Sequence, residues 1–526
     1  MVATAHPLAS AAGLEMLQAG GNAMDAALAA SAVCNVVLPQ SCGLGGDTFF
    51  LYYEAASGRI HGLNSSGAAP AAANREEYLR RGYQQMPFFG PLSISVPGAV
   101  DAYTVAAARF ATRSLGDLFR RAIEYAREGF PITPVAARHI ERARAELAKY
   151  PASARTFLPG GQPPTAGHRF ANPALARSLG LVAEGGRAAF YEGELGERIV
   201  GALREAGGLF TMDDWAGHHA ELYEPPITTT YRGRLVHQTT LPSQGHILLE
   251  ELNIAEQADL AALGLLTPAA IHLLVEAKKL AYADRLVYSG DPRFIATPLE
   301  VLLAKEFAAQ RYREIDPRRA ANEARGARIP EQIADTTYLC AVDRDGNACS
   351  YITSLSAGLG SGVVAGDTGV VLNNRAGRGF TLEEGHPNVL AGGKRTMHTL
   401  NCFLITEHGK PTLVGGTPGG DGQPQWNLQL ITSMIDHGLD VQAAIEAPRW
   451  TSFPGTDPLT LHNPFELRIE DRIGPMVIRG LEERGHRVKV LGPWDGGGAA
   501  QLVVIAADGI LRGGSDPRAD GQALGY

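Results

Sequence analysis

The stretch "EQIADTTYLCAVDRDGNACS", residues 331–350, carries the pattern on which both the fold and the chemistry depend. The charged segment 311–335, rich in Arg, Ala and Glu, ends at Asp335, and two threonines then precede the apolar run "YLCAV". Because Thr favours strands, the simplest interpretation is that Thr336 and Thr337 merely begin a buried strand. Segment 311–335 has few large apolar residues, so we predict a mobile linker there.

A second interpretation gives Thr336 a chemical role. If the chain is cut between Asp335 and Thr336, the new α-amine, with an ordinary pKa of roughly 7.7–8.0, can take the proton from the Thr336 hydroxyl. The residue then supplies both nucleophile and base, a variant of the catalytic-triad logic. The same hydroxyl can make the cut by attacking the Asp335 carbonyl to form an ester that water opens. This interpretation divides the chain into a large part, 1–335, and a small part, 336–526.

Composition excludes several classes of protein. The 526 residues are 45% hydrophobic and 19% charged, which is typical of a globular protein. A net charge of −8 without a Lys/Arg-rich stripe argues against a nucleic-acid partner. Residues 1–37 predict an amphipathic helix pair rather than a signal peptide, and no run is long enough to span a bilayer. The five cysteines stand among apolar neighbours, so we expect buried thiols, no membrane partner and a cytoplasmic location.

The secondary-structure signals change along the chain. Helical patterns dominate the first 330 residues, as in 114–130 and 267–292, whereas 47–64 predicts a strand hairpin. Beyond the linker we expect short strands at 336–343, 347–355, 368–374, 400–406 and 410–416, a helix at 425–438, and strands and turns at 500–521. Two sheets with helices outside accommodate these patterns, so the predicted class is α+β.

The glycine-rich turn "GGTPGGDG", residues 415–422, follows an apolar strand and precedes a helix. Adjacent backbone N–H groups at such a turn can form an oxyanion hole, and glycine lets a ligand approach closely. A Gly-Gly turn alone is most often only a turn. Its combination with the strand-opening Thr336 favours acyl-transfer chemistry.

Several motifs together resemble the γ-glutamyltranspeptidase family of N-terminal nucleophile hydrolases. They include "DTTYLCAVDRDGNACS", "GSGVVAGDTGVVLNN" and "LVGGTPGG" in the second part, and "HPLASAAGLEMLQAGGNAMDAALA" and "EAKKLAYADRLVYSGDPRF" in the first. The resemblance covers nearly the whole chain. It implies a four-layer αββα fold and self-cleavage before Thr336 into two subunits that stay packed together. We expect no cofactor and no metal, and further association of two αβ units stays open.

The resemblance also implies roles for individual residues. Thr336 corresponds to the nucleophile and new N-terminus, and Ser354 to the hydroxyl that assists it, eighteen residues on. Ser356 stands where the family has an Asn. Gly419 and Gly420 correspond to the glycines of the oxyanion hole.

The donor-binding positions differ from the family pattern. Arg75 corresponds to the arginine that binds the donor carboxylate, although a surface ion pair is the simpler interpretation without the motif. Arg375 takes the place of a Gln that helps to hold the donor α-ammonium, and the Asp of that site falls on Arg378 or Gly379. His398 stands where the family has a serine.

Charge connects these differences to the substrate. Two like charges about 4 Å apart at an effective dielectric of roughly 20 repel by about 4 kcal/mol, which is nearly three decades in affinity. An Arg375 that faces the site should therefore reject an ammonium and accept an anion. We expect a donor with a carboxylate and no α-amine, such as an oxamate-like, glutaryl or succinamate-type amide, as in the oxamate amidohydrolases and glutaryl-type acylases of the family. Alternatively, Arg375 points away into an ion pair and leaves the specificity open.

Two other functions remain. The chain is a true γ-glutamyl hydrolase or transpeptidase acting on glutathione, or an unprocessed relative that binds small anions without catalysis. The segment between Phe380 and Lys394 is short, so the family's covering lid should be absent and hydrolysis should exceed transfer. Metallohydrolase chemistry is disfavoured because His398, His272 and His246 are isolated and no HExxH occurs.

Overall fold

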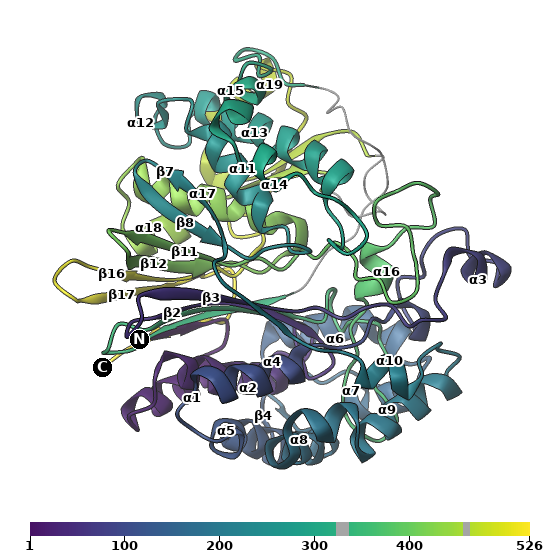
Figure 1. Cartoon of the computed structure of the whole chain (residues 1–526). Coiled ribbons are helices and arrows are strands. Elements are labelled where there is room, and N and C mark those ends of the chain that lie inside the picture. The colour runs from purple at the N-terminus through teal and green to yellow at the C-terminus, as the bar shows by residue number, and fades with distance from the viewer. Residues whose placement is uncertain (322–335, 456–462) are drawn as a thin grey trace.

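The computed structural model describes residues 1–321, 336–455 and 463–526. Within them, two antiparallel sheets form the centre of the molecule (Figure 1). The larger has seven strands, in the order β18 (Gln522–Leu524), β1 (Val2–Thr4), β9 (Thr337–Val342), β10 (Ala348–Ser354), β2 (Asp47–Glu54), β3 (Arg59–Ser65) and β6 (Glu221–Tyr223). Strands from before and after Thr336 are therefore interleaved in one sheet.

The second sheet has six strands and also combines both parts of the chain. Its order is β17 (Leu511–Ser515), β16 (Gln501–Ile505), β12 (Lys410–Gly416), β11 (Phe403–Glu407), β8 (Arg234–Gln238) and β7 (Ile227–Tyr231). Buried apolar side chains of both sheets, among them Phe49, Tyr338, Ile352 and Leu404, form one core cluster. The two sheets thus pack face to face, because each strand turns alternate side chains inward.

Helices cover the outer faces of both sheets, as Figure 1 shows. Against the seven-stranded sheet lie α1 (Pro7–Gln18), α2 (Ala23–Val37), α4 (Ala99–Phe110), α5 (Leu115–Glu128), α6 (Pro134–Leu147), α7 (Pro151–Phe157), α8 (Pro173–Tyr191), α9 (Glu194–Glu205) and α10 (Met212–Ala216). On the other side lie α11 (Gly245–Ala255), α12 (Leu260–Leu263), α13 (Pro268–Tyr288), α14 (Leu299–Leu302), α15 (Lys305–Tyr312), α17 (Gln423–Ile435), α18 (Val441–Glu446) and α19 (Pro475–Glu483).

Smaller elements complete the fold. Short helices α3 (Arg75–Arg80) and α16 (Arg375–Gly379) lie at one end of the sheets, on the right in Figure 1. The remaining pieces are a three-stranded sheet of β13 (Trp450–Phe453), β14 (Glu466–Glu470) and β15 (Val488–Leu491), the pair β4 (Phe130–Pro131) and β5 (Arg169–Phe170), and the 3₁₀ turns Pro91–Ser93, Pro159–Gly161, Gly420–Gly422 and Asp471–Ile473. The predicted mixed class of helix and sheet is confirmed.

Local sequence signals explain where the predicted helices begin. Ser114 caps α5 by accepting a hydrogen bond from the Asp117 N–H, and the Asp117 carboxylate returns a bond to the cap. Thr267 caps α13 by accepting a hydrogen bond from the Ala270 N–H, and Pro268 stands at the first position of the helix. The N-terminal helix pair is also present, but every residue of α2 is buried, so this helix is not amphipathic.

One predicted strand is wrong. Segment 368–374 forms only isolated bridges, between Val371 and Val364 and between Leu372 and Gly45. The Asn373 side chain donates hydrogen bonds to two backbone carbonyls and so ties the segment into a loop. The β-branched pair Val370 and Val371 resembles a strand in sequence but packs in the core as irregular chain.

The segment for which we predict a linker is described only as far as residue 321. Arg311 and Tyr312 belong to α15, and the Arg311 guanidinium bonds the Asp284 carboxylate. Ala320 is buried, and its N–H donates to the carbonyl of Arg484 at 2.7 Å. This first part is therefore anchored to the protein, while 322–335, including the predicted cleavage residue Asp335, lie outside the described residues.

Two further predictions concern the whole fold. All five cysteines are free and buried, as expected. Of the helices in the part of the chain that the structure describes, none has both the length and the apolar character needed to cross a membrane.

Candidate active site

Thr336 lies directly before β9, in the seven-stranded sheet, and is buried. Its Oγ1 lies 3.1 Å from Oγ of Ser354, the last residue of β10. Neighbouring strands in fixed register therefore bring together two hydroxyls that are eighteen residues apart. Ser354 Oγ also accepts the N–H of Ser356 at 2.7 Å, and either hydroxyl can be the donor in the contact with Thr336.

A cavity of about 180 Å³ opens beside the nucleophile candidate. Thr336 and Gly419 both line it, together with Gln40, Ser41 and His139. The structure thus places the strand-opening threonine and the glycine turn at the same cavity, as the sequence predicts. A substrate carbonyl in this cavity can contact both the hydroxyl and the backbone of the turn.

The glycine turn has a backbone that other residues adopt only with strain. Gly419 has φ of 126°, and a Cβ there would lie 2.1 Å from the ring of Trp426. Gly420 follows with φ of 54° and begins a 3₁₀ turn that leads into α17. Glycine is therefore required at 419 for both conformation and space.

Ser356 and Arg378 form the next layer of contacts. Ser356 has φ of 84°, which is unusual for a residue other than glycine, and its carbonyl accepts a bond from Arg378 at 3.2 Å. Such strain persists only where surrounding contacts hold it, and it often marks functional sites. The backbone beside Ser354 is thus locked in place.

Arg375 and His398 meet at a residue that sequence reasoning missed, Asp47. His398 Nδ1 accepts the N–H of Leu400, so Nε2 carries the proton and donates to Asp47 Oδ2 at 2.9 Å. Arg375 is 1% exposed; its Nε lies 3.9 Å from the same Oδ2, and its guanidinium donates to Thr399 Oγ1 at 3.1 Å. Arg375 therefore has a buried acidic neighbour.

Asp47 is also the register partner of Ser354 in the β2–β10 pair. Burial raises the pKa of Asp47 to about 7, although Arg375 and backbone N–H groups oppose the shift. Burial, followed by Arg375 and Arg378, holds the pKa of His398 well below its usual value, so this histidine is neutral. The Asp47 carboxyl group thus lies beside Arg375, and both Arg375 and Arg378 act on the neighbouring His398.

Arg75 is not brought into contact with the other predicted site residues. It begins α3, and its side chain is 30% exposed. Its Nε donates to the carbonyl of Leu382 at 2.9 Å, and its terminal nitrogens lie near Glu76 and Glu384 at 3.9 and 3.8 Å. In this structure Arg75 therefore ties α3 to the short segment after Phe380.

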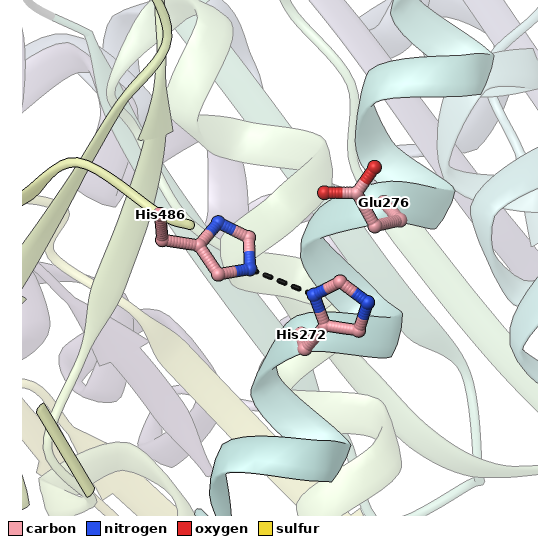
Figure 2. Close-up of side chains that lie close together, drawn as sticks. All are labelled: His272, Glu276 and His486. Atoms are coloured by element: carbon pink, nitrogen blue, oxygen red, sulfur yellow. Dashed lines mark hydrogen bonds between the residues drawn. The ribbon is translucent and has the colours of Figure 1, made fainter. Parts of the chain in front are cut away.

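One cluster outside this site has the residue types of a metal centre. His272 and Glu276 lie one turn apart on α13, and His486 approaches them from the turn after α19 (Figure 2). No sequence pattern predicts this convergence, because His486 is more than two hundred residues from the other two.

The donor atoms of this cluster already have partners. His272 Nε2 bonds the Asp316 carbonyl, so its Nδ1 accepts from His486 at 2.8 Å, the bond drawn in Figure 2. Glu276 binds the Lys279 ammonium at 2.7 Å and the N–H of Ala321 at 3.2 Å. Lys279 thus supplies the positive charge that a metal ion would otherwise bring to Glu276. The cluster fastens the chain around residues 316–321 to α13.

Comparisons with known proteins agree with these motifs. The family described as "Gamma-glutamyltranspeptidase" matches residues 9–526. The glutathione hydrolase-like YwrD proenzyme of Bacillus subtilis is 40% identical, over 100% of this chain and 98% of its own length. The oxamate amidohydrolase proenzyme of Klebsiella pneumoniae is 34% identical, over 100% and 98%. The crystal structure of a cephalosporin acylase from Bacillus halodurans superposes with a TM-score of 0.91 at 35% identity, over 100% and 96% of the two chains.

Proposed function

Because the chain belongs to the γ-glutamyltranspeptidase family, it is an enzyme, and we propose that it is an autoprocessed N-terminal threonine amidohydrolase. We assign its helix, sheet, sheet and helix arrangement to the four-layer αββα fold of N-terminal nucleophile hydrolases. The observation that carries the proposal is the 3.1 Å contact of Thr336 Oγ1 with Ser354 Oγ at a cavity that Gly419 also lines.

The proposed reaction begins with cleavage ahead of Thr336. The freed α-amine takes the hydroxyl proton, Oγ1 attacks the substrate amide carbonyl, and the N–H groups of Gly419 and Gly420 hold the oxyanion. Ser354 donates a hydrogen bond to Oγ1 and stabilises its developing charge. The amine then protonates the leaving group, and water hydrolyses the ester on Thr336.

We propose that the acyl group carries a carboxylate and no α-amine. The buried guanidinium of Arg375, which stands where the family has a Gln that helps to hold the α-ammonium, supports this specificity, because a cation near the donor disfavours an ammonium. Relatives named as an oxamate amidohydrolase and a cephalosporin acylase are consistent with it. Arg75 is the second proposed anchor of the donor carboxylate, and it has to leave the Leu382 carbonyl to act so.

A γ-glutamyl hydrolase is the second candidate, since one relative is named glutathione hydrolase-like. The Asp47 carboxylate, 3.9 Å from Arg375, favours this second candidate to the extent that its negative charge compensates the guanidinium. Glutaryl and γ-glutamyl p-nitroanilides differ only in the α-amine and therefore separate the two candidates.

The test compares the wild type with Thr336→Ala. We expect two bands on a denaturing gel for the wild type, with Thr336 at the N-terminus of the smaller fragment, and one uncleaved, inactive band for the variant. The wild type should hydrolyse the glutaryl anilide faster than the γ-glutamyl one. Turnover by Thr336→Ala would refute the nucleophile, and a clear preference for the γ-glutamyl compound would refute the role given to Arg375.

A further inference from the structure

The glycine turn is held from the other part of the chain. Gln244, directly before α11, donates its side-chain Nε2 to the carbonyl of Gly420 at 2.9 Å. The Tyr282 hydroxyl on α13 bonds the carbonyl of Asp421, and Arg285, one helical turn further on, binds the Asp421 carboxylate at 2.7 Å. Three buried side chains from before Thr336 thus converge on two residues of the turn.

The orientation of the Gln244 amide is determined by its partners. Its Oε1 accepts from the Arg285 guanidinium, so Nε2 must face the other way. Nε2 has two protons and two acceptors, the carbonyls of Gly420 and Thr399. Every hydrogen-bonding group of this amide is therefore in use, and a flip would set its oxygen against two carbonyls.

The direction of the Gly420 N–H depends on the peptides on both sides of this residue. The Gly422 N–H donates to the carbonyl of Gly419 at 2.9 Å. In a trans peptide the Gly420 N–H points opposite to that carbonyl, away from Gly422. The next peptide is held by Gln244 through the Gly420 carbonyl. The peptides on both sides of Gly420 are thus fixed.

The same amide reaches the donor side of the site. Thr399, whose carbonyl binds Gln244, accepts the Arg375 guanidinium through its hydroxyl at 3.1 Å. One side chain therefore connects the backbone that holds the oxyanion with the residue that positions the proposed carboxylate anchor. A shift of Gln244 displaces both relative to Thr336.

We propose that Gln244 and Arg285 are positioning residues that set the oxyanion N–H groups for catalysis, acting through Gly420, Asp421 and Thr399. The inference rests on the proposed function and goes beyond it, because it assigns the geometry of the oxyanion hole to the large part of the chain. Neither residue needs to touch the substrate. Arg285 is buried and orients Gln244, so the two act as one unit.

Gln244→Glu is the sharpest probe, because it keeps the shape and the bond to Arg285 but turns an oxygen toward two carbonyls. In fully cleaved protein, we expect kcat for glutaryl p-nitroanilide to fall roughly ten- to hundredfold, with KM within about threefold, as for reacting groups displaced by a fraction of an ångström. Arg285→Lys should act in the same direction, and the double variant should lose less than the product of the two effects.

Gln429→Glu is the matched control. Gln429 also donates two bonds and accepts one, to Gln425 and Trp450, but it touches no residue of the turn. Its kcat should stay within about twofold of the wild type, whatever its loss of melting temperature.

Hydrogen exchange followed by mass spectrometry supplies a measurement that does not depend on activity. Peptides covering 415–424 should exchange faster in Gln244→Glu than in the wild type and in Gln429→Glu. Unchanged exchange, or an unchanged kcat in Gln244→Glu, overturns the positioning role. A wild type that hydrolyses no amide refutes the proposed function instead, and with it the catalytic part of the inference. In that case, faster exchange in Gln244→Glu would still show that Gln244 holds the backbone of the glycine turn.

Discussion

Replacing Gly419 by Ala should nearly abolish turnover while leaving the protein folded. The new Cβ would lie 2.1 Å from Cζ3 of Trp426, whereas carbon atoms pack at about 3.5–4.0 Å. Trp426 is itself held, since its Nε1 donates to Thr451 Oγ1 at 2.9 Å. The turn must therefore move by about 1.4 Å or more, and its φ of 126° adds strain on the order of 1–3 kcal/mol.

A displacement of this size at reacting groups costs about a hundredfold in rate. We expect kcat for glutaryl p-nitroanilide to fall by about that factor in the cleaved Gly419→Ala enzyme. Gly409→Ala is the control, because Gly409 also has positive φ, 79°, but nothing within 4 Å of the added carbon. It should lose melting temperature without losing kcat. A Gly419→Ala enzyme with kcat within threefold of the wild type would refute the role of this turn.

Two further predictions concern the neighbours of the nucleophile. Ser354→Ala removes the hydroxyl 3.1 Å from Thr336 Oγ1. We expect kcat to fall about ten- to hundredfold, which corresponds to the loss of one hydrogen bond to a charged group. Assays of cleaved protein measure kcat, and a change below threefold would show that Ser354 does not assist Thr336. Asp47→Asn should alter the pH dependence of stability. Burial raises the pKa of Asp47 to about 7, so the folded wild type keeps a proton that the unfolded chain loses above about pH 4. The free energy of unfolding of the wild type therefore falls as the pH rises from 4 to 7, by at most roughly 4 kcal/mol. The melting temperature of Asp47→Asn should therefore rise relative to the wild type between pH 4 and pH 7.5, and a constant difference would show that Asp47 titrates normally.

Local patterns predict those parts of the fold that local interactions determine. The caps at Ser114 and Thr267, and the alternating strands after Thr336, are encoded within a few residues. The failure at 368–374 is of another kind, because Val370 and Val371 satisfy strand propensity whereas the Asn373 side chain ties the backbone down. The two bonds of this side chain join residues 328 and 278 positions apart, and no short window of sequence contains them.

The candidate site divides in the same way. Thr336, Ser354 and Gly419 follow from motifs; the strand register brings the two hydroxyls together, and Gly419 lines the same cavity as Thr336. Asp47 gave only a weak signal, an acidic residue between a glycine pair and a buried strand. Nothing in the sequence pairs Gln244 with Arg285, and only the packing of α11 against α13 reveals their common target.

The interleaving of strands from the two parts of the chain affects how the enzyme loses activity on heating. In the larger sheet, β9, β10 and β18 lie among β1, β2, β3 and β6, so neither product of a cut before Thr336 retains a complete sheet. Unfolding of the cut protein would release two chains that must find each other again, and recovery would depend on dilution. Heat inactivation should then be irreversible. The half-life of activity at high temperature would depend on the rate of unfolding rather than on the equilibrium between the folded and unfolded states.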